Sequence, residues 1–134
     1  MNYLVTGGAG FIGSALVNKL ISNKSSVTVI DNLSTGYLSN ISKQATFIEG
    51  DVSDELTLHS LKDQEFDAIL HLAGQSSGEI SFDDPVYDLN CNVTSTLRLL
   101  DYAVRASCKR FVYASSMSVY GERPNQEKYS EQDI

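Results

Sequence analysis

A glycine-rich segment near the start of the chain constrains the fold more than any other feature of the sequence. Gly7, Gly10 and Gly13 follow a short apolar run at residues 3–5 and open onto an amphipathic helix pattern. In such a strand–turn–helix unit, glycines allow a tight turn, a close backbone approach to a pyrophosphate and close packing of the helix on the strand. The segment therefore predicts a phosphate-binding βα turn, although three glycines can also serve an ordinary structural turn.

An acidic residue at the end of the second apolar run narrows the choice between these alternatives. Val27–Ile30 is followed by Asp31, which lies 18 residues after Gly13. A carboxylate at about this distance can accept hydrogen bonds from the ribose hydroxyls of NAD, and its charge would repel the 2′-phosphate of NADP. The pair of signals predicts a dinucleotide site that favours NAD.

The composition is that of an ordinary globular domain. The chain has 134 residues with 42% hydrophobic and 20% charged side chains, so we expect residues 1–134 to form one NAD-binding domain. A net charge of −7 argues against nucleic-acid binding, and no apolar run is long enough to suggest a membrane span. With no signal peptide expected, Cys91 and Cys108 are interpreted as reduced thiols of a cytoplasmic protein, and no metal site is expected.

The apolar runs alternate with helical patterns along the whole chain. This alternation predicts an α/β, Rossmann-type doubly wound parallel sheet with five strands in the order 3-2-1-4-5. Asp84 and Pro85 predict an N-cap and a first-turn proline that begin the last helix. The expected strands are 2–6, 26–31, 45–49, 67–72 and 110–115, and the expected helices are 11–23, 54–63 and 86–107, with a loop at 32–44.

Five motifs in order resemble those of the extended short-chain dehydrogenase/reductase family. They are similar in particular to the motifs of nucleotide-sugar epimerases and dehydratases of the UDP-glucose 4-epimerase type. The resemblance covers the whole chain and implies NAD as cofactor and a nucleotide-sugar as the substrate of the full-length protein. The motifs occupy residues 6–13, 31–36, 50–54, 71–76 and 115–121.

The resemblance also implies a role for each matching position. Ser116 matches the catalytic serine or threonine, and the 31–36 segment would surround the adenosine ribose. We interpret His71 as a structural histidine, and Asn92 either helps to hold the site or is a buried polar group bonded to nearby backbone. The cofactor-binding residues implied are Gly7, Gly10, Phe11, Ile12, Gly13, Asp31, Asn32, Ser34, Thr35, Gly36, Asp51, Val52, Leu72, Ala73, Gly74, Gln75 and Asn92.

The sequence does not contain the Tyr-x-x-x-Lys pair on which the family's chemistry depends. None of the seven tyrosines is followed four positions later by lysine. We therefore expect a truncated chain that holds the cofactor-binding portion of an epimerase or dehydratase, lacks the C-terminal strands and the substrate-binding part, and is inactive alone. The alternative is a non-catalytic NAD-binding or regulatory module. An uncovered fifth strand would favour a homodimer or a higher oligomer.

Overall fold

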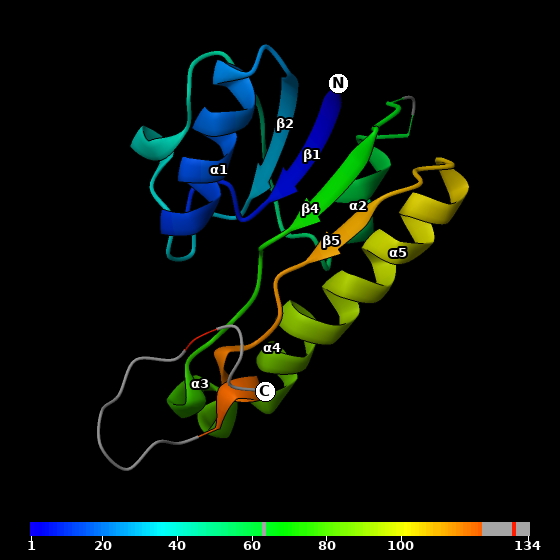
Figure 1. The fold of residues 1–134 in the computed structure, drawn as a ribbon. Helices are drawn as coiled ribbons and strands as arrows, with labels where there is room; N and C mark the ends of the chain where they lie inside the picture. The colour runs from blue at the N-terminus through cyan, green and yellow to red at the C-terminus, as the bar shows by residue number, and fades with distance from the viewer. Residues whose placement is uncertain (63, 122–129, 131–134) are drawn as a thin grey trace.

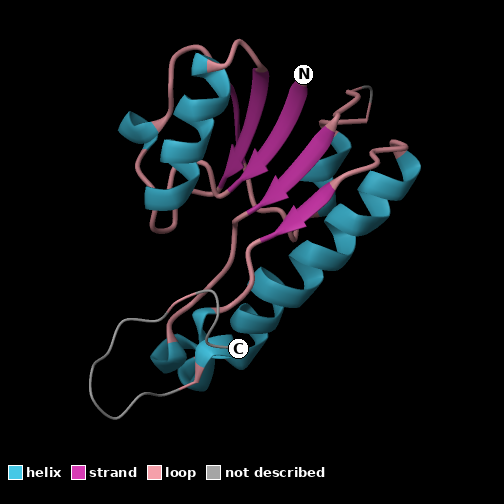
Figure 2. Cartoon of the chain, viewed as in Figure 1, coloured by secondary structure: helices cyan, strands magenta, loops and turns pink. Residues whose placement is uncertain are grey.

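The computed structural model describes residues 1–62, 64–121 and 130. Five parallel strands form one sheet in the order β3-β2-β1-β4-β5, which confirms the predicted fold class and strand order. Figures 1 and 2 show the strands running side by side, with their carboxyl ends toward the same edge. The strands are β1 (Asn2–Thr6), β2 (Ser26–Asp31), β3 (Thr46–Glu49), β4 (Ala68–His71) and β5 (Phe111–Tyr113).

Alternate residues of the strands enter two separate apolar cores, one on each face of the sheet. Leu4 and Ile69 face a core that includes residues of α2 (Glu55–His59) and α5 (Ser95–Arg105). Val5 and Val29 face the other core, to which Val17 of α1 (Phe11–Ser22) belongs. Helices therefore cover both faces, as in a doubly wound sheet, which explains why the strands are continuous apolar runs.

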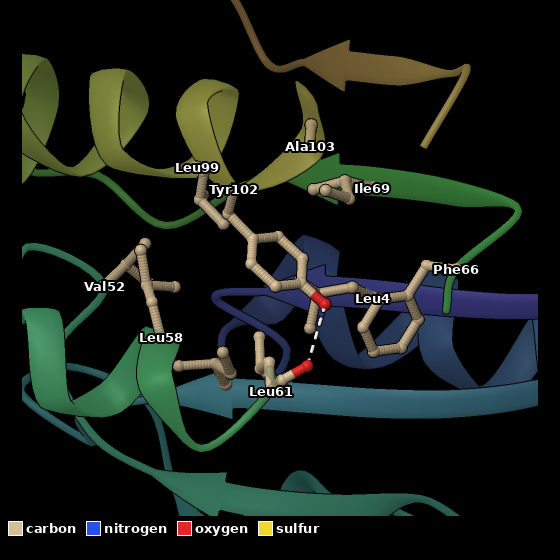
Figure 3. Close-up of a cluster of buried hydrophobic side chains, with 10 residues drawn as sticks. Leu4, Val52, Leu58, Leu61, Phe66, Ile69, Leu99, Tyr102 and Ala103 are labelled. Atoms are coloured by element: carbon tan, nitrogen blue, oxygen red, sulfur yellow. Dashed lines mark hydrogen bonds between the residues drawn. The ribbon is translucent and has the colours of Figure 1, made fainter. Parts of the chain in front are cut away.

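The larger core contains a tyrosine, Tyr102, whose hydroxyl is hydrogen-bonded to main-chain carbonyls. Tyr102 is 6% exposed, and Figure 3 shows its ring among apolar side chains. Its single hydroxyl hydrogen is shared between the carbonyl oxygens of Leu61 and Gln64, at 3.1 and 2.9 Å. Burial raises the pKa of Tyr102 to about 12. The neutral phenol thus fastens α5 to the segment that follows α2.

The prediction of a single regular helix at residues 86–107 is wrong. The structure has α4 (Pro85–Leu89), a π-helical turn at Asn90–Thr94 and then α5. Within the turn, the Ser95 amide bonds to the Asn90 carbonyl, five residues back. The Ser95 and Thr96 hydroxyls donate to main-chain carbonyls four residues back, where they compete with the backbone amides of the helix. Hydrophobic periodicity does not predict such side-chain bonds.

Other boundaries also differ from the sequence-based expectation. The helix expected at 54–63 is only the five residues of α2, and β5 is shorter than the predicted 110–115. A further short helix, α3 (Gly78–Asp83), was not predicted; Ser77 caps it by accepting from the Ile80 amide. The predicted cap of α4 is present, because Asp84 accepts from the Tyr87 amide at 2.9 Å and Pro85 occupies the first turn.

In the part of the chain that the structure describes, no helix is long and apolar enough to cross a membrane.

Candidate cofactor site

A hollow lies at the carboxyl edge of the sheet, where β1, β2, β3 and β4 end. It brings together residues from the glycine turn and from the loops after β2, β3 and β4. One side is formed by α4, the π-helical turn and the first residue of α5. Its lining residues are Gly7, Gly10, Asp31, Asn32, Ser34, Thr35, Gly36, Gly50, Asp51, Val52, Leu72, Ala73, Gly74, Tyr87, Cys91 and Ser95.

The glycine turn leaves no room for side chains. Gly7 has φ +71°, and a Cβ there would lie 2.7 Å from the main-chain nitrogen of Ala73. A Cβ on Gly13 would lie only 2.0 Å from the Gly7 carbonyl oxygen. Glycine at Gly7 brings the strand end against the loop after β4, and glycine at Gly13 lets α1 begin directly against the turn.

The start of α1 offers backbone donors next to this turn. Gly10 is the N-cap and has no side chain that could accept from the helix amides. The first amides of a helix, here those of Phe11, Ile12 and Gly13, have no carbonyl partner within the helix, and the helix dipole adds positive potential there. Together with the lack of side chains at Gly7 and Gly10, this geometry suits a phosphate group.

Asp31 fastens two of the surrounding segments to each other. It is 8% exposed, and its two carboxylate oxygens accept from the amides of Ala9 and Leu33, each at 2.9 Å. Asn40 adds a second link, since its side-chain amide donates to the Ala9 carbonyl at 2.8 Å. The carboxylate is therefore held at the rim of the hollow and keeps lone pairs for further donors such as ribose hydroxyls.

Asp51 forms the opposite end of this rim. Burial acts to raise its pKa, but hydrogen bonds from the hydroxyl and amide of Ser53 and from the side-chain amide of Asn32 lower the pKa overall. The donor distances to Asp51 are 2.6 Å and 2.8 Å from Ser53 and 3.0 Å from Asn32. The acid is kept ionised as an acceptor, and Asn32 connects it to the loop after β2.

The loop after β4 is held by Asn92 of the π-helical turn. The Asn92 side-chain amide donates to the Gln75 carbonyl, and its oxygen accepts from the Gln75 amide, both at 2.9 Å. The Gln75 side chain turns toward Ser77, Ser81 and Asp88. Both side chains are thus occupied in holding the loop, and their predicted contacts with a cofactor stay predictions.

The structure adds four lining residues that the sequence reading missed. Gly50 precedes Asp51, whereas Tyr87, Cys91 and Ser95 follow one another at intervals of four residues along the α4–α5 segment. All three line the hollow, and their intervals of four residues are the signal from which a shared helix face could have been predicted. Burial raises the pKa of the Cys91 thiol, which favours its neutral form.

Ser116 lies beyond the carboxyl end of β5, where it is exposed and is not among the lining residues. Its carbonyl accepts from the Val119 amide at 3.3 Å, at the start of the 3-10 helix Met117–Tyr120. Position 124, the place for lysine after Tyr120, falls outside the described residues. Among those that are described, no group of three or more His, Cys, Asp or Glu residues could hold a metal ion.

The doubly wound sheet, the glycine turn and the fixed acid after β2 together define a Rossmann-type dinucleotide-binding domain. The model of the NAD dependent epimerase/dehydratase family matches residues 3–133, and the chain belongs to this family. It corresponds to the N-terminal, NAD-binding portion of its longer relatives.

Three relatives illustrate the similarity. A UDP-glucose 4-epimerase of Mycolicibacterium smegmatis is 39% identical over 130 residues, which cover 92% of this chain and 42% of the relative. The Thermus thermophilus UDP-glucose 4-epimerase, solved with NAD, is 36% identical with a TM-score of 0.87, covering 98% of this chain and 43% of that one. The Thermotoga maritima enzyme, solved with UDP-glucose, is 40% identical with a TM-score of 0.86, covering 92% and 40%. The chain thus spans about two fifths of the length of these relatives.

Proposed function

We propose that this chain binds NAD in the hollow at the carboxyl edge of the sheet. The observation that carries the proposal is the fixed Asp31 carboxylate, which joins the Ala9 amide to the Leu33 amide beside a turn that excludes side chains. The pyrophosphate would lie against Gly7, Gly10 and the first amides of α1. The ribose would lie against Asp31, and the adenine ring against Asp51 and Val52.

Calorimetric titration of the 134-residue chain with NAD and NADP tests this proposal. We expect saturable binding of NAD and weaker binding of NADP, because a 2′-phosphate would meet the charge of a carboxylate that two backbone bonds hold in place. No heat of binding with NAD, or a preference for NADP, would contradict the proposal.

For the whole protein, we propose NAD-dependent epimerisation of a nucleotide-sugar. The relatives are named for UDP-glucose 4-epimerase activity, and one was solved with UDP-glucose. When bound, NAD would supply an acceptor for the hydride on the sugar carbon that bears the reacting hydroxyl, and the hydride would return to that carbon afterwards. Ser116, which follows β5, is the catalytic candidate in this chain, and its hydroxyl would hydrogen-bond a substrate oxygen.

The alternative is a non-catalytic NAD-binding or regulatory module, which the missing Tyr-x-x-x-Lys pair favours for the 134 residues alone. Loss of a positioned acid/base lowers rates by about 10²–10⁴-fold. We therefore expect no measurable interconversion of UDP-glucose and UDP-galactose by this chain, even where it binds NAD. Turnover above the background of a Ser116→Ala variant would contradict this expectation.

We further propose that the chain self-associates. β5 is an end strand of the sheet, and Val112 and Tyr113 are about half exposed. Large exposed apolar side chains also recur every three or four residues along α3, α4, the π-helical turn and α5. They are Phe82, Val86, Leu89, Val93, Leu97, Leu100 and Val104, which are 40% to 91% exposed.

Light scattering tests the self-association, which exposed apolar surface of this kind favours. Dimers or larger species are expected, and Leu97→Glu should shift them toward monomer. A monodisperse wild-type monomer would contradict the proposal.

A cytoplasmic location is proposed as well, and the two free thiols, Cys91 and Cys108, support a reducing compartment.

A further inference from the structure

A buried histidine connects three of the segments that surround the hollow. His71 is 1% exposed at the end of β4, and both of its ring nitrogens are bonded. Nδ1 lies 2.7 Å from the Thr6 hydroxyl at the end of β1, and Nε2 lies 3.0 Å from the Thr96 hydroxyl in α5. The ring therefore bridges two strands and the helix that continues from the π-helical turn.

The other hydrogen bonds of Thr6 and Thr96 determine which atom donates in each bond to the His71 ring. The Thr96 hydroxyl donates to the Asn92 carbonyl at 2.7 Å, so its oxygen accepts from His71 Nε2–H. His71 Nδ1 is then an acceptor, and the Thr6 hydroxyl donates to it while accepting from the Ala73 amide at 3.2 Å. One neutral tautomer satisfies every partner, and the lowered pKa of His71, which burial moves to about 4, agrees with a neutral ring.

The hydrogen bonds that begin at the His71 ring lead to two residues of the loop after β4, Ala73 and Gln75. Through Thr6 it reaches the amide of Ala73, and through Thr96 it reaches the main chain of Asn92, whose side chain holds both backbone groups of Gln75. Leu72, Ala73 and Gly74 line the hollow, whereas His71, Thr6 and Thr96 do not. The three polar side chains therefore support the loop without lining the hollow, and the His71 ring packs against Phe111 at a centroid distance of 6.0 Å.

We propose that His71 is a positioning residue that, with Thr6 and Thr96, sets the place of the 72–75 loop relative to the glycine turn and thereby sets the affinity for NAD. The proposal rests on the proposed NAD-binding function and adds to it a set of residues that do not touch the ligand. Its physical basis is that a buried polar group without a hydrogen-bond partner lowers the stability of the folded state. Loss of one hydroxyl therefore favours a rearrangement of the ring and the loop.

A matched pair of substitutions at Thr96 tests the proposal. Thr96→Val keeps the shape of the side chain and removes the hydroxyl, whereas Thr96→Ser keeps the hydroxyl. We expect Thr96→Val to weaken NAD binding roughly three- to tenfold, the effect of one hydrogen bond, and Thr96→Ser to restore it. Equal NAD affinity in wild type and Thr96→Val would overturn the proposal.

Tyr102→Phe is the control for a general loss of stability. Tyr102 lies in α5, the same helix as Thr96, and the substitution removes its bonds to Leu61 and Gln64, none of which lines the hollow. Measured where circular dichroism shows all variants to be folded, its NAD affinity should equal that of wild type. If Tyr102→Phe weakens NAD binding as much as Thr96→Val does, lowered stability suffices as the cause and the positioning role is overturned.

A measurement without ligand separates this inference from the proposed function. If wild type does not bind NAD, the proposed function fails, and amide hydrogen exchange then decides the inference. The Ala73 and Gln75 amides should exchange faster in Thr96→Val than in wild type and in Tyr102→Phe. Unchanged exchange at these two amides would overturn the positioning role.

Discussion

The two walls of the hollow are built in different ways. The wall formed by the glycine turn and the loop after β2 depends on the absence of side chains at Gly7 and Gly13 and on one fixed carboxylate, Asp31. The wall formed by the loop after β4 depends on side chains, since His71 and Asn92 hold it through bonds to residues far away in the sequence.

This difference teaches how each wall should respond to change. The glycine turn of the first wall fails when atoms are added, because a Cβ at Gly7 or Gly13 has no space. The second wall fails when atoms are removed, because buried donors and acceptors lose their partners. Four predictions, ordered from the largest expected effect to the smallest, test this contrast.

Gly13→Ala should have the largest effect. Its Cβ would lie 2.0 Å from the Gly7 carbonyl oxygen, so we expect the free energy of unfolding to fall by about 3 kcal/mol, as for severe overpacking. Gly78→Ala is the matched control, because a Cβ there meets nothing within 4 Å. Urea unfolding of both variants measures the difference, and equal stabilities would refute the steric account of the turn.

Acid should weaken the second wall through His71. The pKa of His71 is lowered to about 4 from an ordinary value of 6.5, so the unfolded chain binds the proton more strongly. The stability contributed by the neutral ring is complete above pH 6.5 and is lost as the pH falls toward 4, by up to about 3 kcal/mol.

Urea unfolding at several pH values, compared with a His71→Gln variant, isolates this effect from the carboxylates. The wild type should lose more stability between pH 6.5 and pH 4 than the variant, which has no ring to protonate at this position. Parallel curves for the two proteins would show that His71 titrates as it does in the unfolded chain.

Asp31→Asn should weaken NAD binding by about 10- to 100-fold, the range for hydrogen bonds to a charged acceptor. The amide can accept on one side only, so either Ala9 or Leu33 loses its acceptor. Without the charge, the preference for NAD over NADP should narrow. Asp54→Asn removes the same charge at the cap of α2 and should leave both affinities unchanged; calorimetry with each nucleotide decides.

Asn32→Ala should have the smallest effect. The Asn32 side chain is exposed and gives Asp51 one of its three hydrogen bonds, at 3.0 Å, so we expect NAD to bind about two- to threefold more weakly. A loss beyond tenfold in calorimetry would mean that the tie between the two loops is as important as Asp31 itself.

Most of the first wall could be predicted from the sequence, because its determinants are local. Gly7 to Gly13 adjoin the strand and the helix that they connect, and Asp31 directly follows an apolar run. Asp51, after β3, was predicted in the same way, because it follows a strand-end glycine. For the second wall, the sequence predicted the lining by Leu72, Ala73 and Gly74 and a holding role for Asn92, but not the bonds of His71. Thr6, His71 and Thr96 are separated by 65 and 25 positions, and no local pattern connects them.

The interruption of the last helix shows the same limit. Periodicity predicted one helix at 86–107, whereas hydroxyl bonds from Ser95 and Thr96 accompany a π-helical turn that carries Asn92 and Cys91. A hydroxyl side chain can face solvent, cap a helix or bond to the preceding turn, and the sequence does not choose among these.

The sequence by itself determined the alternation of strands and helices, the order of the sheet, the glycine turn and the acids at the strand ends, because each follows from side-chain size, apolar spacing or a nearby backbone requirement. Only the tertiary structure decided that Gln75 turns away from the hollow, that Tyr87 and Cys91 line it, and that His71 links β1 and β4 to α5. These features depend on which side chains meet after packing, and a buried hydrogen bond forms only where a partner from another element is already in place.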